Sequence, residues 1–211
     1  MKILISFLFF FFITSNVNAV NFTLKKIINL NEPWGSTFIN DRELLVTEKS
    51  GKIKLINLNN KNTKIIDHNL KVLEYGQGGL LDILFHDDTV WVSYTEDRGN
   101  YKTSTSIAKG NFNKNKIIFE NIFQAHPPID SPYHFGSRLA IKNDYLFASV
   151  GERGQGMIAQ DATKHPGSII RIHLDGKIPR DNPKFIDKKS WLPEIFQIGV
   201  RNPQGLTLST F

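Results

Sequence analysis

Cysteine is missing from this chain of 211 residues. Folding therefore needs no disulfide, and the length is sufficient for one domain that folds without such bridges. Clusters of basic residues with interleaved aromatic residues are also missing, although the formal net charge is +6. This charge is interpreted as a solvated basic surface, and no nucleic-acid partner is predicted. Helical periodicity is lacking too, because no long stretch combines it with capping residues.

One long hydrophobic run is present, and it lies at the N-terminus. Lys2 precedes the apolar residues 3–13, and Asn-Val-Asn-Ala at 16–19 offers a signal-peptidase site. The run is shorter than the roughly 18–20 apolar residues that a membrane-spanning helix needs. Residues 1–19 are therefore predicted to be a signal peptide, with an uncleaved membrane tether as the alternative. We expect an exported protein, periplasmic or secreted, with no stable membrane span after cleavage.

The rest of the chain, residues 20–211, reads as strands and turns almost throughout. Runs of alternating apolar and polar residues, bounded by glycine, asparagine and aspartate, are typical of strands. The stretch 132–154 reads as strand, turn, strand. The second strand of this stretch is predicted at 145–150. Other strands are predicted at 43–47, 53–58, 63–66, 89–94, 105–110 and 168–173, and 204–208 is interpreted as the start of another.

The predicted strands recur in groups that start roughly 45–55 residues apart, a spacing typical of propeller blades with inserted loops. A β-sandwich is the competing all-β fold, but it predicts strands at tighter and more even intervals. We therefore predict an all-β protein, a β-propeller of which about the first three to four blades are present. Because propellers usually close with at least four blades, the domain that begins at residue 20 is expected to be cut short at its C-terminus.

A histidine and a carboxylate occur at the ends of two successive predicted strands. His134 stands just before the first strand, and Glu152 stands just past the end of the second, 145–150. Strand ends and the loops beyond them commonly carry functional residues. A carboxylate that fixes the tautomer of a histidine and stabilises its imidazolium form makes the ring a general base. The alternatives are an ordinary hydrogen-bonded histidine and an exposed glutamate. The other histidines are not at metal-ligand spacing and are interpreted as structural.

Four groups of motifs follow one another along the chain. They are PWG at 33–35 with LLVTE at 44–48; GQGGLLD at 76–82 with FH at 85–86; HFGSRL at 134–139 with GERG at 151–154; and GSIIR at 167–171 with DNP at 181–183 and GVRNPQG at 199–205. In these motifs and their order the chain resembles the glucose/sorbosone dehydrogenase family, the soluble aldose sugar dehydrogenases that depend on pyrroloquinoline quinone (PQQ). The resemblance spans nearly all of the chain after the signal, and only the N-terminal portion of the family domain.

The resemblance implies a six-bladed propeller and a role for each matching residue. His134 matches the family's catalytic base and a substrate contact, and Glu152 matches the catalytic carboxylate, where the family usually has aspartate. Gln77 matches a substrate-binding residue of the sugar pocket, with a plain turn residue as the alternative. Arg201 and Asn202 match cofactor-binding residues, and Arg201 would also stabilise the negative charge that builds on the quinone as hydride arrives. A structural ion pair is the alternative for Arg201.

The function implied by the resemblance is oxidation of an aldose at its anomeric carbon to the lactone, with hydride transfer to PQQ and electrons passed to a separate acceptor. Calcium is implied as a second cofactor. Its ligand segment in the family lies beyond Phe211, so no metal ligand is predicted in this chain. Two alternatives from other classes stay open: a propeller that only binds sugar or protein, and a metal-dependent hydrolase related to lactonases.

Overall fold

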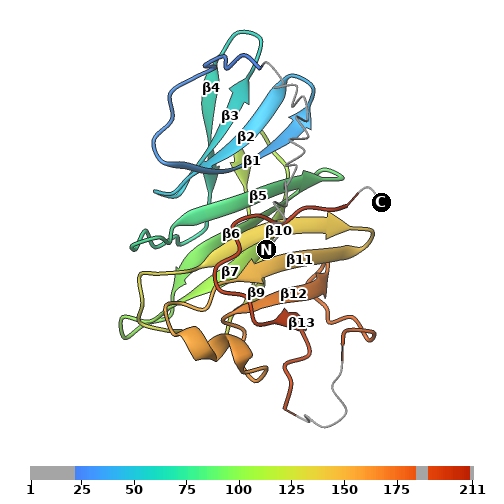
Figure 1. Cartoon of the computed structure of the whole chain (residues 1–211). Coiled ribbons are helices and arrows are strands. Elements are labelled where there is room, and N and C mark those ends of the chain that lie inside the picture. Colours follow the sequence, from blue (N-terminus) through green and yellow to red (C-terminus); the bar gives the residue numbers. More distant parts are fainter. Residues whose placement is uncertain (1–21, 184–189, 210–211) are drawn as a thin grey trace, which may run out of the picture.

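Three antiparallel β-sheets form the protein in a computed structural model that describes residues 22–183 and 190–209. The predicted signal peptide, residues 1–19, lies outside the described residues. The sheets follow one another along the chain and lie side by side, in the order blue, green and orange (Figure 1). Among the described residues, the one helical segment is the short 3₁₀ helix η1, Gly156–Gln160.

Each sheet is built on four strands that are consecutive or nearly consecutive in sequence. The first sheet contains β1 (Pro33–Asn40), β2 (Glu43–Glu48), β3 (Lys52–Asn57) and β4 (Thr63–His68). The second contains β5 (Leu80–His86), β6 (Thr89–Asp97), β7 (Thr103–Asn111) and β9 (Glu120–Gln124). The third contains β10 (Gly136–Lys142), β11 (Tyr145–Val150), β12 (Ser168–His173) and β13 (Ile195–Ile198). A short strand, β8 (Lys116–Ile117), lies in the connection between β7 and β9 of the second sheet. It pairs in parallel with β4 of the first sheet.

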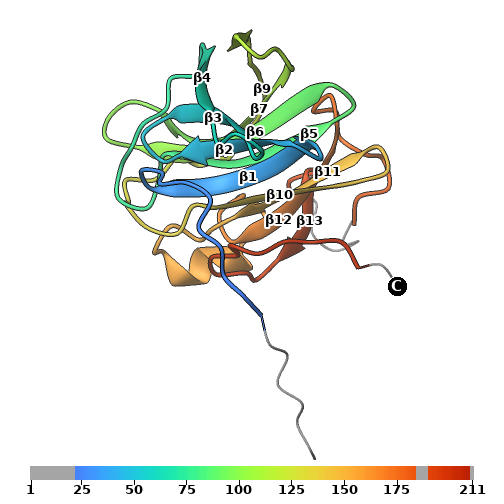
Figure 2. The ribbon, with the colours of Figure 1, turned by 90° about the horizontal axis from the view of Figure 1, so that it is seen from above.

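The first strands of the three sheets adjoin one another. β5 contacts both β1 and β10, and the three strands lie next to one another in the view from above (Figure 2). Four-stranded meanders placed side by side through their first strands are consecutive blades of a β-propeller. The predicted all-β propeller fold is confirmed, with three blades present in the described residues.

Apolar side chains fill the two interfaces between neighbouring blades. Leu45 of the first blade and Val92 of the second belong to one buried cluster, and Ile107 of the second and Ile170 of the third belong to another. Because side chains alternate between the two faces of a strand, each blade can present an apolar face to each neighbour. The middle blade is covered on both faces, and most of β6 is therefore buried.

A buried hydroxyl on the second strand of each blade links that blade to the segment that follows. These fully buried hydroxyls belong to Thr47, Ser93 and Ser149. Each accepts a hydrogen bond from a backbone N–H of the first strand of its own blade, at Gly35, Asp82 and Arg138 respectively. These N–H groups lie at register shifts, where the strand ladder leaves them without a backbone partner. Each hydroxyl donates in turn to a backbone carbonyl of the next segment, at Leu81, Ser137 and Pro203.

The prediction of a strand at 204–208 is wrong, because the structure has no strand after β13 in the described residues. The carbonyl oxygens of Pro203 and Gln204 accept instead from the side chains of Ser149 and Arg138, both at 2.9 Å. The segment therefore lies beside the third blade as β10 lies beside the second (Figure 1). Side-chain hydrogen bonds, and not a backbone ladder, hold it there.

Ser93→Ala is expected to lower the free energy of unfolding by about 1–3 kcal/mol, because it leaves a buried N–H and a buried carbonyl without a partner. Urea denaturation of the two proteins measures the difference. Ser50→Ala, at an exposed serine in the turn before β3, is the control and should change stability by less than about 0.5 kcal/mol. Equal stability of the Ser93→Ala variant and the parent protein would contradict a role of the hydroxyl in joining blades.

Candidate active site

His134 lies in the loop that leads into β10, with a strained backbone. Its φ angle is 51°, in the left-handed region that few non-glycine residues adopt. Its side chain is 14% exposed, so the ring is mostly covered but reachable from solvent. Strained conformations of this kind persist only where the surroundings fix them, and they are common at functional sites.

Two glycines bring the loop of His134 against the end of β11. A Cβ atom on Gly151 would lie 2.0 Å from the carbonyl oxygen of His134, and one on Gly136 would lie 2.6 Å from the backbone nitrogen of Gly151. Any side chain at either position would push the two backbones apart. The HFG and GERG motifs therefore meet directly, which places the residue after Gly151 beside the histidine.

That residue is Glu152, whose side chain is hydrogen-bonded to His134. The contact joins Nδ1 of the imidazole and Oε1 of the carboxylate. The second oxygen, Oε2, accepts from the backbone N–H of Gly156, and the backbone N–H of Glu152 donates to the carbonyl of Arg201 at 2.8 Å. Glu152 is only 2% exposed, so the interpretation as an exposed strand-end residue is wrong. The longer side chain of glutamate, compared with aspartate, reaches the ring.

The carboxyl group of Glu152 is held in its ionised form. Burial by itself would raise its pKa, but the hydrogen bond with His134 and those from the backbone N–H groups of Gly156 and Gly154 outweigh burial, and the pKa lies below its ordinary value of 4.5. An ionised carboxylate only accepts hydrogen bonds, so Nδ1 of His134 must carry the proton. The Nε2 atom of the neutral ring is then the one with a free lone pair, as a general base requires.

Gln77 approaches the same histidine from the second blade's side. Its side-chain oxygen accepts the backbone N–H of His134 at 2.8 Å, and its own backbone N–H donates to Pro132 at 2.8 Å. Gln77 is therefore more than a plain turn residue, because it supports the loop that carries His134. Its side-chain NH₂ group can still donate to a ligand. The predicted contact with a sugar stays a prediction.

Arg201 and Asn202 adjoin this pair through the backbone. The side-chain oxygen of Asn202 accepts the N–H of Gly136 at 3.0 Å, and the Arg201 carbonyl bonds to Glu152 as described above. The Arg201 residue is exposed, and its guanidinium makes no ion pair with any residue in the described part of the chain. The alternative of a structural ion pair therefore has no support here, and the predicted roles at a cofactor stay predictions.

The sequence reading assigned no role to Arg153, the residue after Glu152. Its guanidinium is buried and donates to backbone carbonyls on the loop that carries His134. An arginine directly after the carboxylate in GERG was the available signal. The sequence pattern does not indicate whether the arginine side chain is buried, so it could not distinguish Arg153 from an exposed arginine.

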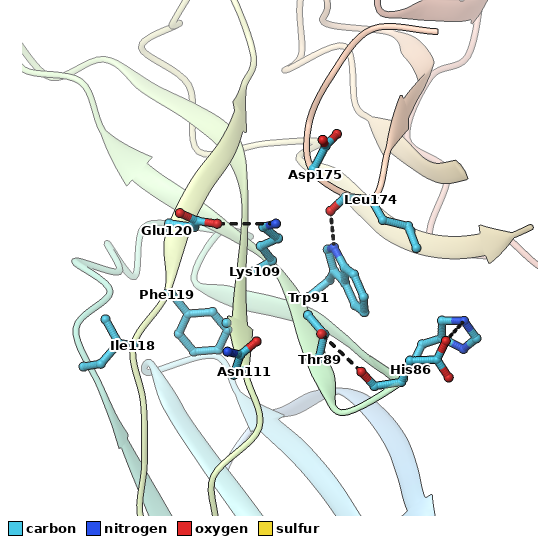
Figure 3. A pocket seen from close by; sticks show the side chains of 12 residues that line it. His86, Thr89, Trp91, Lys109, Asn111, Ile118, Phe119, Glu120, Leu174 and Asp175 are labelled. Carbon is cyan, nitrogen blue, oxygen red and sulfur yellow. Dashed lines mark hydrogen bonds and ion pairs between the residues drawn. The ribbon is translucent and has the colours of Figure 1, made fainter. Parts of the chain in front are cut away.

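A cavity of about 510 Å³ lies at the opposite end of the strands and holds none of the predicted site residues (Figure 3). Trp91 forms one wall, where its indole N–H donates to the carbonyl of Leu174 at 3.2 Å, and Lys109 pairs with Glu120 at 3.4 Å.

Within residues 22–183 and 190–209, no group of three His, Cys, Asp or Glu residues could hold a metal ion. In the same residues no helix is long and apolar enough to cross a bilayer.

Comparison with known proteins identifies the family. The family model of glucose / sorbosone dehydrogenase matches residues 30–211, which is most of the chain. The chain belongs to the glucose/sorbosone dehydrogenase family. The resemblance predicted from the four groups of motifs is thereby confirmed.

Two curated relatives and one solved structure illustrate the similarity. Aldose sugar dehydrogenase YliI of Escherichia coli (strain K12) is 32% identical over 190 residues, which cover 85% of this chain and 51% of that protein. Quinoprotein glucose dehydrogenase B of Acinetobacter calcoaceticus is 27% identical over 236 residues, which cover 92% of this chain and 48% of that protein. A crystal structure of a glucose dehydrogenase superposes with a TM-score of 0.81 at 32% identity, covering 86% of this chain and 56% of that one. The chain spans about half the length of the curated relatives that it matches.

Glu152→Gln is expected to lower stability at neutral pH, and the loss should shrink as the pH falls. The pKa of Glu152 is depressed in the folded protein, so its ionised form stabilises the fold above the ordinary value of 4.5, and this contribution is lost as the pH falls through the folded pKa. Denaturation curves of both proteins across the acidic range measure the difference.

The same substitution in a His134→Ala background is the control. The hydrogen bond to His134 is the leading interaction that lowers the pKa, so the pH-dependent difference should be smaller in that background. A difference that is independent of pH in the parent background would contradict the ionised, histidine-paired carboxylate.

Proposed function

We propose that the protein is an exported, PQQ-dependent aldose sugar dehydrogenase that oxidises the anomeric carbon of an aldose to the lactone. Family membership and relatives named as aldose sugar and glucose dehydrogenases support oxidoreductase activity. The single observation that supports the chemical step is the hydrogen bond between His134 and the buried Glu152 at the end of β11. The activity of the whole protein, its substrate and its partners are part of the proposal.

His134 takes the proton of the anomeric hydroxyl in this proposal. With Nδ1–H donated to Glu152, the lone pair of Nε2 is available, and no partner of Nε2 is found among the described residues. As the proton arrives, the ring becomes an imidazolium, and the ionised Glu152 stabilises that charge. The side-chain NH₂ of Gln77 donates to a sugar hydroxyl and so orients the ring of the substrate.

Arg201 and Asn202 are the residues of this chain proposed to hold the cofactor. PQQ presents carboxylates and quinone carbonyls, which are hydrogen-bond acceptors. The exposed Arg201 guanidinium, unpaired within the described residues, and the NH₂ group of Asn202 are matching donors, because the oxygen of Asn202 is already used by Gly136. Bound PQQ supplies the acceptor for the hydride that leaves the anomeric carbon. Calcium stays part of the family expectation, and the proposal assigns no residue of this chain to it.

His134→Ala is expected to lower the rate of sugar oxidation about 10²–10⁴-fold, because the variant lacks the general base. The assay follows reduction of a redox dye, which replaces the separate electron acceptor, with purified protein, PQQ, calcium and an aldose. His173→Ala is the matched control, since His173 lies at the far end of β12 against Tyr145 and should keep parental activity.

Full turnover in a folded His134→Ala protein would reject the assigned role. The two alternative functions give different results in the same preparation. Sugar binding without dye reduction favours a binding propeller, and PQQ-independent opening of a lactone with a divalent metal favours a hydrolase.

Export is expected to remove residues 1–19 and leave Val20 as the first residue. N-terminal sequencing of the protein from the periplasm or medium of an expressing bacterium tests this cleavage. A version that lacks residues 1–19 is the control and should stay in the cytoplasm. Recovery of the uncleaved chain from the membrane fraction would favour the tether instead.

A further inference from the structure

Arg153 is a buried cation whose four side-chain hydrogen bonds all go to neutral oxygens. Its residue is 2% exposed. On one side Nε donates to the carbonyl of Tyr133 at 3.0 Å, and one terminal nitrogen donates to the carbonyl of Ser131. On the other side the two terminal nitrogens donate to the carbonyl and the hydroxyl of Thr103, at 2.9 and 2.8 Å. The guanidinium thus joins the start of β7 in the second blade to the loop before β10.

The same residue contacts the histidine loop at two further points. The guanidinium carbon lies 3.7 Å from the centre of the Phe135 ring, in a cation–π contact. The backbone N–H of Arg153 donates to the carbonyl of His134 at 3.2 Å. Arg153 therefore bonds to the residues before His134, to His134 itself and to the residue after it.

Burying Arg153 in this way destabilises the fold, so a contribution to stability does not explain it. Burial lowers the pKa of Arg153 to about 10, and no carboxylate of the described residues pairs with it to offset the desolvation. Two other arginines of this chain, Arg138 and Arg171, each pair with an aspartate, Asp82 and Asp181. A buried guanidinium that ties the loop before β10 to the start of β7 is explained by what that loop carries.

The loop needs such support, because His134 has a left-handed backbone. A non-glycine residue keeps this conformation only where neighbouring contacts impose it. With the loop free, His134 would relax to an ordinary φ, and its ring would leave Glu152. The fork geometry of a guanidinium, with its fixed directions for five N–H groups, can hold several carbonyls at once, which a lysine cannot.

We propose that Arg153 is a positioning residue that fixes the loop of His134 and thereby keeps Nδ1 on Glu152 and Nε2 free for the substrate. The catalytic meaning of this role rests on the proposed function. The positioning itself does not, since it concerns a hydrogen bond and a tautomer that can be observed in the protein without sugar or cofactor.

The test is heteronuclear NMR of the protein with isotope-labelled histidine, at a pH where the rings are neutral. The His134 signals are assigned by their loss in His134→Gln. In the parent protein we expect the Nδ1–H tautomer and a strongly downfield Nδ1 proton, as a hydrogen bond to a carboxylate produces. In Arg153→Met and in Arg153→Lys, which keeps the charge but loses the fork, that proton signal should be lost and the two tautomers should become mixed.

Arg171→Met is the matched control. Arg171 also stacks on an aromatic ring, that of Tyr145, and bonds to Asp181 and Asn182, but far along the third blade from His134. Its loss should lower stability and leave the His134 signals unchanged. Thr103→Val, which removes a single acceptor of the Arg153 fork, should broaden or shift the His134 signals even if Arg153→Met does not fold. Unchanged His134 signals in folded Arg153→Lys and Thr103→Val proteins would overturn the proposal.

A kinetic measurement separates this proposal from the proposed function. In PQQ-loaded protein, Arg153→Lys should lower kcat about 100-fold with little change in KM, because a misplaced base slows the chemical step more than it weakens sugar binding. A lower kcat/KM that comes from a raised KM alone, with kcat unchanged, would contradict positioning of the base. If the parent protein reduces no dye with any aldose, the proposed function fails, and the NMR result still decides the role of Arg153.

Discussion

The buried hydroxyls of the second strands fix how the blades meet. Each one satisfies a backbone N–H that a register shift leaves unpaired, and each then reaches the next segment of the propeller. A single small side chain therefore joins a local irregularity to a long-range contact. Since Ser149 uses this device to hold Pro203, the segment that carries Arg201 and Asn202 takes its place through the same contact that orders the blades.

The candidate site is one unit made from several parts of the chain. Glu152 bonds to the ring of His134 and, through its backbone, to the carbonyl of Arg201, while Asn202 bonds to Gly136 at the start of β10. The groups proposed to handle the proton and those proposed to hold the cofactor are thus connected without any ligand. Such preorganisation lowers the reorganisation that a reaction requires.

Sequence reasoning predicted the parts of this arrangement that depend on local pattern. Alternation gave β11 and β12 with their observed bounds, whereas β9 and β13 were missed because each buries a single residue and shows no alternation. Their places at strand ends and the family resemblance marked His134 and Glu152 as candidates, but only the structure shows that the carboxylate reaches the ring. The contacts of Arg153 could not be predicted, because Thr103 is 50 residues away and burial of a charge is decided only when the blades assemble.

The short parallel pairing of β8 with β4 has a consequence for how the molecule resists aggregation. β4 is the outermost long strand of the first blade, and an unpaired edge of this kind is a template on which another chain can add a strand. The chain covers part of that edge with its own β8, and the side chain of Asn69 continues the cover by exchanging two hydrogen bonds with the backbone of Phe119. The first blade therefore contacts the second both at its outer edge, through β8 and Asn69, and at its first strand, through β1 and β5. We expect the two blades to unfold together rather than one after the other.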